Sequence, residues 1–219
     1  MSVISSDFHG NIKKLNKFLK YKPDVQHIFA GDAVDSWDKP YENQIEVLRR
    51  LVASKCILIY GNHELSYHPD YRMACSGRHA YGTLNFPQYI TKPERWCAAY
   101  NADGYLVTHA GLSAKHVGRA KTVNGLVGKL KKQFRNKHPD IFDVGTCRGG
   151  LSISGGIFWY DFRYDWVKLA PVNQVFGHCS LKEPWENKTD LYHHVCINSD
   201  DRSGECWAFD TEIKEVVVL

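Results

Sequence analysis

The stretch Gly31-Asp32-Ala33-Val34-Asp35 directly follows the apolar run HIFA (residues 27–30). Carboxylates directly after such a run are the pattern from which the fold is predicted. Four further apolar runs, at residues 2–4, 56–60, 105–107 and 172–176, are also followed by residues of metal-ligand or catalytic type. The blocks that follow them are Ser6-Asp7-Phe8-His9-Gly10, Gly61-Asn62-His63-Glu64, Thr108-His109-Ala110-Gly111 and Gly177-His178. Such runs predict buried strands, and glycine lets the chain turn sharply out of a sheet. We therefore expect five strand ends to present Asp, Asn and His to one crevice.

The order of the elements predicts an α/β fold. Helical spacing of apolar residues follows the first two blocks, at 12–19 and 45–52, so strands and helices alternate over the first sixty residues. This alternation favours right-handed crossovers and a mostly parallel core. A third helix is expected at 123–134. The last third returns to strands at 172–176, 194–198, 205–209 and 216–219, and their close spacing indicates an antiparallel addition.

The segment 64–100 is rich in aromatic residues and contains Pro69, Pro87 and Pro93. It is expected to be a helical or loop insertion that covers the site. Its Tyr and Trp side chains either pack over the core, which is the favoured interpretation, or stack a nucleobase. Since no linker or repeat interrupts the chain, one domain spanning residues 1–219 is expected.

Composition narrows the class of protein. With 219 residues, 43% of them hydrophobic, the chain can bury a substantial core, and it has no run long enough to span a membrane. The N-terminus leads straight into the first block and is not expected to be a signal peptide. Seven cysteines, odd in number and without a C-x-x-C motif, predict reduced thiols in a cytoplasmic protein rather than a zinc knuckle. The net charge of +4 suits an anionic substrate but does not favour nucleic-acid binding.

Taken singly, each block is weak evidence, because an isolated Asp-x-His more often caps a helix or bonds within a loop. As candidate metal ligands, the blocks jointly supply two Asp, two or three His and one Asn at strand ends. This mixture of oxygen and imidazole ligands, without thiolate, suits Mn²⁺, Fe or Zn²⁺. The joint pattern predicts a metal site, and a pair of cations about 3.5–4 Å apart can clamp a phosphoryl group during attack by water.

The ordered motifs D-x-H, G-D-x-x-D, G-N-H-E, H-A-G and G-H resemble those of the calcineurin-like metallophosphoesterase superfamily. The second, third and fourth blocks look most like its phosphoprotein phosphatase branch, and the chain length is similar to that of small phage and bacterial members. The resemblance covers residues 7–178. It implies a β-sandwich of mixed sheets with flanking helices and a centre of two divalent metal ions, with Mn²⁺ the first choice.

The resemblance also implies a role for each matching residue. Asp7 and His9 would bind the first metal, and Asp32 would bridge both. Asn62, His109 and His178 would bind the second. His63 would remain outside the metal sphere as the general acid, with Asp35 orienting its ring.

One departure from the branch concerns phosphate binding. The branch usually continues the second block as G-D-x-V-D-R-G, but here Ser36-Trp37 follows Asp35, so the phosphate-gripping Arg is missing. Arg163, which follows an aromatic segment, is the first replacement candidate, and Arg148 in the Gly-rich loop is the second. His193-His194 resembles a metal pair by residue type. Because neighbours in a strand point to opposite faces, a structural role is favoured for that pair.

The leading functional prediction is a phosphomonoesterase of the Ser/Thr protein phosphatase type, acting on a phosphorylated protein. A dinucleoside polyphosphate hydrolase or phosphodiesterase, acting on a nucleotide, is the alternative within the enzyme class. A non-catalytic scaffold with the same fold is disfavoured, since such a scaffold is expected to lose a ligand or the catalytic His, and all of these positions are present.

Overall fold

The computed structural model describes residues 1–71, 82–120, 122–198 and 204–219. In these ranges the first sheet is built from β1 (Ser2–Ser5), β2 (Gln26–Phe29), β3 (Ile57–Ile59), β4 (Trp96–Cys97), β10 (Trp207–Asp210) and β11 (Glu215–Val218). The second sheet is built from β5 (Tyr100–Ala102), β6 (Tyr105–Val107), β7 (Gln174–Phe176), β8 (Trp185–Lys188) and β9 (His193–Cys196). The α-helices are α1 (Ile12–Lys20), α2 (Tyr41–Ala53), α3 (Asn62–Tyr67), α4 (Gly82–Asn85), α5 (Pro87–Ile90) and α6 (Val123–Arg135). Short 3₁₀ turns are η1 (Ala114–His116), η2 (Pro139–Phe142) and η3 (Thr146–Arg148).

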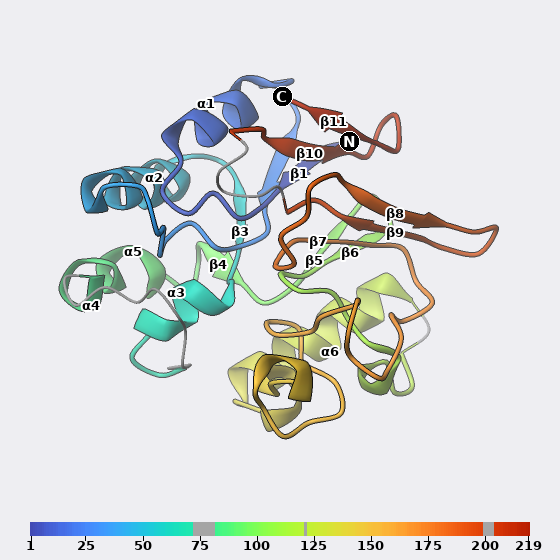
Figure 1. Cartoon of the computed structure of the whole chain (residues 1–219). Coiled ribbons are helices and arrows are strands. Elements are labelled where there is room, and N and C mark those ends of the chain that lie inside the picture. Colours follow the sequence, from blue (N-terminus) through green and yellow to red (C-terminus); the bar gives the residue numbers. More distant parts are fainter. Residues whose placement is uncertain (72–81, 121, 199–203) are drawn as a thin grey trace.

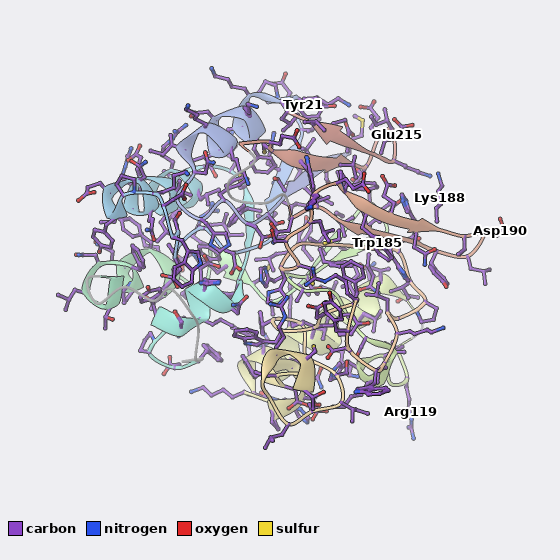
Figure 2. All side chains as sticks on the ribbon, viewed as in Figure 1. Tyr21, Arg119, Trp185, Lys188, Asp190 and Glu215 are labelled. Carbon is purple, nitrogen blue, oxygen red and sulfur yellow. The ribbon has the colours of Figure 1, made fainter. Side chains whose placement is uncertain are left out.

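Both sheets are mixed. The first has the order β11-β10-β1-β2-β3-β4 and the second the order β5-β6-β7-β9-β8. The pairs β1–β2, β2–β3 and β3–β4 are parallel, as are β6–β7 and β7–β9. Figure 1 shows α1 and α2 beside the first sheet and α6 beside the second, while the hairpin of β8 and β9 projects from the edge. Trp185, Lys188 and Asp190 mark that hairpin in Figure 2.

Alternation along the strands explains the layers. In β1, Ile4 belongs to the core between the two sheets, whereas Val3 packs in the cluster that holds the helices. The same switch of face separates Ile28 from Phe29 in β2, as the period of two in a strand requires. The core between the sheets contains Ile4, Ile28, Ile59, Val107, Val175, Val195 and Phe209, all buried. The α/β sandwich with mixed sheets and flanking helices therefore agrees with the sequence prediction.

The helices begin where local side chains satisfy their free N–H groups. Asn11 accepts hydrogen bonds from the backbone of Lys13 and Lys14 and so starts α1 directly after the first block. Leu15 and Phe18 of this helix are buried on one face. The side chain of Thr122 starts α6 in the same way by accepting from Gly125.

The antiparallel addition expected in the last third of the chain is confirmed for β10 and β11, since β10 pairs with β1 in antiparallel fashion, but not for the pairing of β9. The hairpins β8–β9 and β10–β11 are antiparallel, but β9 pairs with β7 in parallel, and the two hairpins belong to different sheets. The close spacing reveals only the hairpins, because partner choice between sheets depends on contacts with distant strands.

The segment 64–100 contains α4, α5 and β4 and most of α3, with residues 72–81 outside the described part of the chain. It does more than form an insertion, since Trp96 and Cys97 pair with Leu58 and Ile59 and extend the first sheet. Its expected role as a cover over the site stays a prediction. Within the described ranges, no helix combines the length and apolar character needed to cross a bilayer.

Candidate active site

Every predicted metal ligand, together with Asp35 and His63, lies just beyond the carboxyl end of a strand. Here β1 is followed by Asp7 and His9, β2 by Asp32 and Asp35, β3 by Asn62 and His63, β6 by His109 and β7 by His178. Because β1, β2 and β3 are parallel, and β6 and β7 are parallel in the other sheet, these ends gather on common edges. Hydrogen bonds tie the loops together: Asp7 N donates to Gly31 O, and His9 N donates to Asp32 O.

The loops hold several of these residues in the left-handed backbone region. The φ angles are 56° at Asp7, 41° at His9, 63° at Asp32, 63° at Asp35 and 66° at His178. Residues with a Cβ adopt this region at a cost, and such strain clusters at functional sites where the surrounding structure enforces it. The arrangement turns five polar side chains toward the crevice at the expense of local stability.

Glycines allow the loops to approach one another closely. A Cβ at Gly177 would overlap the Asp7 carboxylate, and one at Gly61 would overlap that of Asp32. Gly31 has a φ of +91°, and a Cβ there would lie 2.6 Å from Gly61 N. Of the three, Gly31 alone needs glycine for its backbone angle, while Gly61 and Gly177 need it for space.

Asp32 lies at the centre of the cluster. Its Oδ2 atom is 3.9 Å from His9 Nε2, 3.9 Å from His63 Nε2 and 3.2 Å from His109 Nε2. Two groups with metal-ligand geometry share this carboxylate, the first formed by His9, Asp32 and His63 and the second by Asp32, His109 and His178.

Electron-pair donors converge in the second group. His109 Nε2 is 2.9 Å from Asn62 Oδ1 and 3.1 Å from His178 Nδ1, and the last two atoms are 3.1 Å apart. Such separations are close to those between ligands that share one cation with bonds of about 2.0–2.2 Å. Asn62 thus completes the second group.

Backbone carbonyls set the direction of two histidine rings. Nδ1 of His109 lies 2.8 Å from Ala30 O, and Nδ1 of His9 lies 2.6 Å from Val34 O. A hydrogen bond donated from Nδ1 leaves the lone pair on Nε2, which faces the carboxylates. Both rings are therefore oriented as metal ligands usually are.

His63 and Asp35 form a separate pair. His63 Nδ1 lies 2.9 Å from Asp35 Oδ2. The other carboxylate oxygen of Asp35 accepts a hydrogen bond from the Tyr67 hydroxyl. The backbone N–H of Asp35 donates to Gln44 Oε1 at 2.8 Å. Tyr67 and Gln44 were not singled out from the sequence, and their contacts leave Asp35 with one orientation.

Glu64 organises the backbone of the site. It is fully buried, and its carboxylate accepts hydrogen bonds from Asp32 N at 2.8 Å, Ala33 N at 2.7 Å and Gly61 N at 2.9 Å. The block after β2 and the block after β3 are thus bound to one anion. Because Glu64 is fully buried, it does not form a surface ion pair.

Asn198 is a further contact that the sequence analysis did not assign. Its Nδ2 donates to Asp7 Oδ1 at 2.9 Å, and His178 N donates to the same carboxylate at 3.2 Å. Asn198 Oδ1 and His178 Nε2 are buried and have no hydrogen-bond partner among the described residues. Buried polar atoms of this kind call for a bound ion or water.

The electrostatics of the cluster favour bound cations. Burial raises the pKa of Asp7 to about 6. Burial also works against ionisation of Asp32, yet His109 and His63 hold its pKa below the usual value. In turn, burial opposes protonation of His109, but the Asp32 carboxylate raises its pKa to about 9. Two buried carboxylates with imidazole and amide donors fit divalent cations of the Mn²⁺, Fe or Zn²⁺ type.

The two candidate phosphate-binding residues share one carboxylate. Arg163 donates to Asp161 through Nε at 2.9 Å and Nη2 at 2.8 Å, and Arg148 donates through Nε at 3.1 Å. Burial works against ionisation of Asp161, but its bonds from Arg163 and the charge of Arg148 lower its pKa to about 2. The Trp159 ring, two residues before Asp161, is 5.6 Å from the His178 ring, so this segment adjoins the metal-ligand cluster.

His193 and His194 lie apart from this cluster and from each other. His193 Nε2 is 2.7 Å from Glu186 Oε2, whereas His194 Nε2 is 2.9 Å from Ala170 O. They bond in different directions, as expected for neighbours in a strand.

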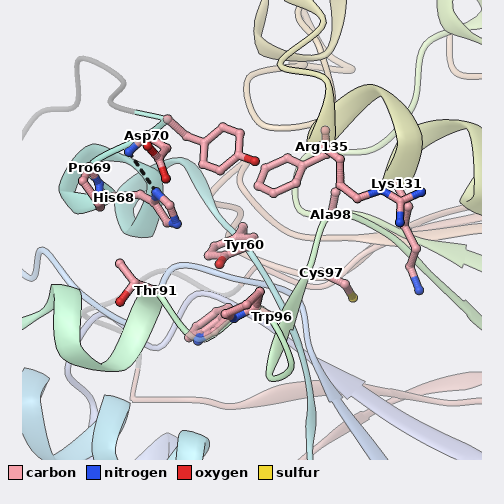
Figure 3. A pocket seen from close by; sticks show the side chains of 13 residues that line it. Tyr60, His68, Pro69, Asp70, Thr91, Trp96, Cys97, Ala98, Lys131 and Arg135 are labelled. Carbon is pink, nitrogen blue, oxygen red and sulfur yellow. Dashed lines mark hydrogen bonds between the residues drawn. The ribbon is translucent and has the colours of Figure 1, made fainter.

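The aromatic residues near the 64–100 segment line a cavity of about 440 Å³, shown in Figure 3. The Tyr60 ring stacks on Trp96 at 5.2 Å and on Phe134 at 5.3 Å, and Tyr71 stacks on Phe134 at 4.3 Å. Since the faces of Tyr60 already have ring partners, packing accounts for these side chains. The cavity wall includes none of the metal-ligand candidates.

Comparisons with known proteins agree with this geometry. The chain matches the Metallophos family model, described as calcineurin-like phosphoesterase, over residues 3–216. The fold is similar to that of a cold-active protein-tyrosine phosphatase of a psychrophilic Shewanella species, with a TM-score of 0.62 and 17% identity over 100% of this chain and 80% of that one. A putative diadenosine tetraphosphatase has a TM-score of 0.56 and 16% identity, covering 100% and 92% of the two chains.

A protein serine/threonine phosphatase of Saccharomyces cerevisiae has a TM-score of 0.56 and 15% identity, covering 100% of this chain and 78% of that one. At these identities the likenesses show the fold alone. Among curated proteins, no sequence match is found.

Proposed function

Since the chain belongs to the calcineurin-like phosphoesterase family and is thus a metal-dependent phosphoesterase, we propose that its centre is dinuclear and hydrolyses phosphomonoesters in the manner of a Ser/Thr protein phosphatase. One observation carries this proposal: Asp32 Oδ2 lies 3.9 Å from His9 Nε2 on one side and 3.2 Å from His109 Nε2 on the other. A carboxylate that belongs to two ligand groups is suited to bridge two cations.

The chain supplies two sets of ligands around this bridge. Asp7, His9 and Asp32 form the first set, and Asp32 with Asn62, His109 and His178 forms the second. When bound, a pair of divalent cations supplies Lewis-acid polarisation of the phosphoryl group and a water nucleophile at neutral pH. Hard oxygen donors beside imidazole make Mn²⁺ our first choice, with Fe or Zn²⁺ as alternatives.

His63 is proposed to deliver the proton to the leaving oxygen. Its Nδ1 is held by Asp35, so Nε2 is the atom turned toward Asp32, at 3.9 Å. The position of His63 in the first group leaves a second role open, that of a ligand. The clamp on Asp35 by Tyr67 and Gln44 supports the general acid, because an acid catalyst needs a fixed ring.

Arg148 and Arg163 are proposed to bind the substrate phosphate. Ser36, at the usual position of the phosphate-gripping Arg, donates instead to Asp38 Oδ1 at 3.0 Å within its own loop. The Asp161 carboxylate draws both guanidinium groups together next to Trp159 and His178. The two arginine side chains remain about 30% exposed. One carboxylate between two cations leaves a net positive charge for a phosphate dianion.

Metal removal tests the centre itself. Chelation is expected to abolish hydrolysis and Mn²⁺ to restore it, while Asp32→Asn should lower both metal content and turnover. The control is Asp38→Asn, a carboxylate in the loop after Ser36 that we place outside the ligand sets. Full activity in a sample that elemental analysis finds free of metal would rule the mechanism out.

Substrate class is tested by comparing kcat/KM on a phosphopeptide and a dinucleoside tetraphosphate under one metal condition. With no Arg at position 36, the metal ions contribute more of the binding to the substrate phosphate. We therefore expect activity on a broad range of substrates, with monoesters preferred. The alternative, a nucleotide hydrolase, is retained because a putative diadenosine tetraphosphatase has a similar fold. A preference of about a hundredfold for the dinucleotide, equal to ~2.7 kcal/mol, would establish that alternative.

A further inference from the structure

Four large apolar side chains between residues 151 and 166 are exposed to solvent. Leu151 is 100% exposed, Trp166 82%, Tyr164 67% and Ile153 58%. Elsewhere in the described ranges such side chains are scattered along the chain, at Met1, Trp37, Leu84, Leu191, Ile213 and Val218. A concentration of exposed apolar surface marks an interaction site more often than single residues do. We call Leu151, Ile153, Tyr164 and Trp166 the apolar rim.

Hydrogen bonds join the two halves of the apolar rim. Trp166 N donates to Ile153 O at 3.3 Å. The carboxylate of Asp165 accepts from Gly155 N at 2.9 Å and from Cys147 Sγ at 3.1 Å. The loop is therefore fixed with its apolar side chains outward, and a partner that binds there has little ordering entropy to overcome.

The apolar rim adjoins the phosphate-binding cations. Arg163 and Arg148 both bond to Asp161, and the Arg163 guanidinium carbon lies 5.1 Å from the centre of the Tyr164 ring. At the other end of the segment, Trp159 contacts His178. Residues 159–166 thus lead from Trp159, which contacts the proposed metal ligand His178, past Arg163 to the exposed apolar side chains.

We propose that the apolar rim docks apolar side chains that flank the phosphorylated residue of a polypeptide substrate. This inference rests on the proposed phosphomonoesterase function and assigns its substrate class. An extended chain advances about 3.3–3.6 Å per residue, so side chains two or three positions from the phosphorylated residue lie about 7–11 Å from it. That reach covers the 5.1 Å between the Arg163 guanidinium carbon and the Tyr164 ring.

The composition of the apolar rim favours a polypeptide over a nucleotide. Single-stranded nucleotides are recognised by ring stacking together with hydrogen bonds to the edges of the base. Leu151 and Ile153 offer neither a planar face nor a polar group. Exposed aliphatic and aromatic side chains on segments joined by a backbone hydrogen bond, close to the arginine pair, are instead suited to an apolar peptide segment that carries a phosphate.

The test uses two phosphopeptides that differ only in their flanking residues, apolar in one and Ser/Gly in the other, with p-nitrophenyl phosphate as a small substrate. Trp166→Ala and Ile153→Ser are expected to lower kcat/KM for the apolar peptide about tenfold and to leave the other two substrates unchanged. Leu191→Ser is the matched control, since Leu191 is 88% exposed and follows Asp190, which lies on the β8–β9 hairpin in Figure 2. It should alter none of the three rates.

Binding of a fluorescent apolar phosphopeptide gives a second reading that does not depend on turnover. Weaker binding to Trp166→Ala than to wild type or Leu191→Ser is expected. Equal peptide preference in all variants, or a loss on Trp166→Ala confined to a dinucleoside tetraphosphate, would overturn the docking inference. Absence of p-nitrophenyl phosphate hydrolysis in wild type with Mn²⁺ would instead refute the proposed function. The peptide-binding measurement would still test the docking inference by itself.

Discussion

Replacing Glu64 by Gln tests the backbone clamp at the centre of the site. In wild type, Oε2 accepts from Asp32 N and Gly61 N, while Oε1 accepts from Ala33 N. A glutamine can keep one oxygen toward the first two donors, but its NH₂ group then faces Ala33 N, donor against donor. The variant loses the charge of the acceptor and one complete hydrogen bond, and it leaves a buried N–H unsatisfied.

The cost follows from these contacts. An unsatisfied buried group costs about 1–3 kcal/mol, and each bond to a charged group is worth about 1.5–3 kcal/mol, more than a neutral one. We therefore expect Glu64→Gln to lower the free energy of unfolding by roughly 2–4 kcal/mol. Activity should fall as well, since Asp32 and the Asn62-His63 turn lose their common anchor.

The assay is denaturant unfolding of both proteins in chelator, so that bound metal does not obscure the difference. Glu46→Gln is the matched control: Glu46 is partly exposed and bonds to Arg49 on α2, so its loss should cost less than about 1 kcal/mol. If Glu64→Gln were no more destabilising than Glu46→Gln, the clamp would not hold the two loops as described.

Three further predictions concern catalysis and acid stability. His63→Asn should keep its metal content and lose about 10²–10⁴-fold in kcat, less with a good leaving group such as nitrophenolate; loss of a metal ion would identify His63 as a ligand. Arg163→Ala and Arg148→Ala should each lower kcat/KM with metal content unchanged, and wild-type kinetics in either variant would remove that residue from the phosphate site. The pKa of Asp161 is lowered from 3.8 to about 2, so its stabilisation, about 2 kcal/mol, is complete above pH 4 and is lost as the pH falls toward 2. Unfolding of wild type and Asp161→Asn in chelator should therefore show a stability gap that closes over this interval, and a gap independent of pH would contradict the assignment.

The sequence was informative where function depends on local pattern. Asp7 and Asp32 follow apolar runs that alternate between two cores, so both the strands and the polar residues at their ends were predictable. Contacts between distant segments were not predictable from the sequence. Asn198 reaches Asp7 across 191 residues, and no periodicity signals such a contact. The pairing of β10 with β1 was likewise hidden, because a hairpin pattern does not specify which sheet it joins.

The same reasoning explains why Asp161 escaped notice beside Arg163. Only Phe162 separates them in the sequence, and an Asp at that spacing is usually a surface residue. In the structure it is buried at 1% exposure and bonds to Arg163 and to Arg148, so its role depends on the Gly-rich loop folding back onto it. Burial of a charge is a tertiary property that composition alone does not reveal.

The site also links metal binding to the stability of the fold. Asp7, His9 and Asp32 combine left-handed backbone angles with burial, and burial opposes the ionised form of both carboxylates. Each feature costs free energy in the metal-free chain. The geometry is nevertheless imposed by the clamp of Glu64 and by the close approach of Gly61 and Gly177 to the carboxylates. Cations that bind the folded chain but not the unfolded one offset the charge repulsion and raise stability in proportion to RT ln(1 + [L]/Kd). The residues proposed as ligands are therefore those through which bound cations would stabilise both sheets, because they lie at the ends of strands in each.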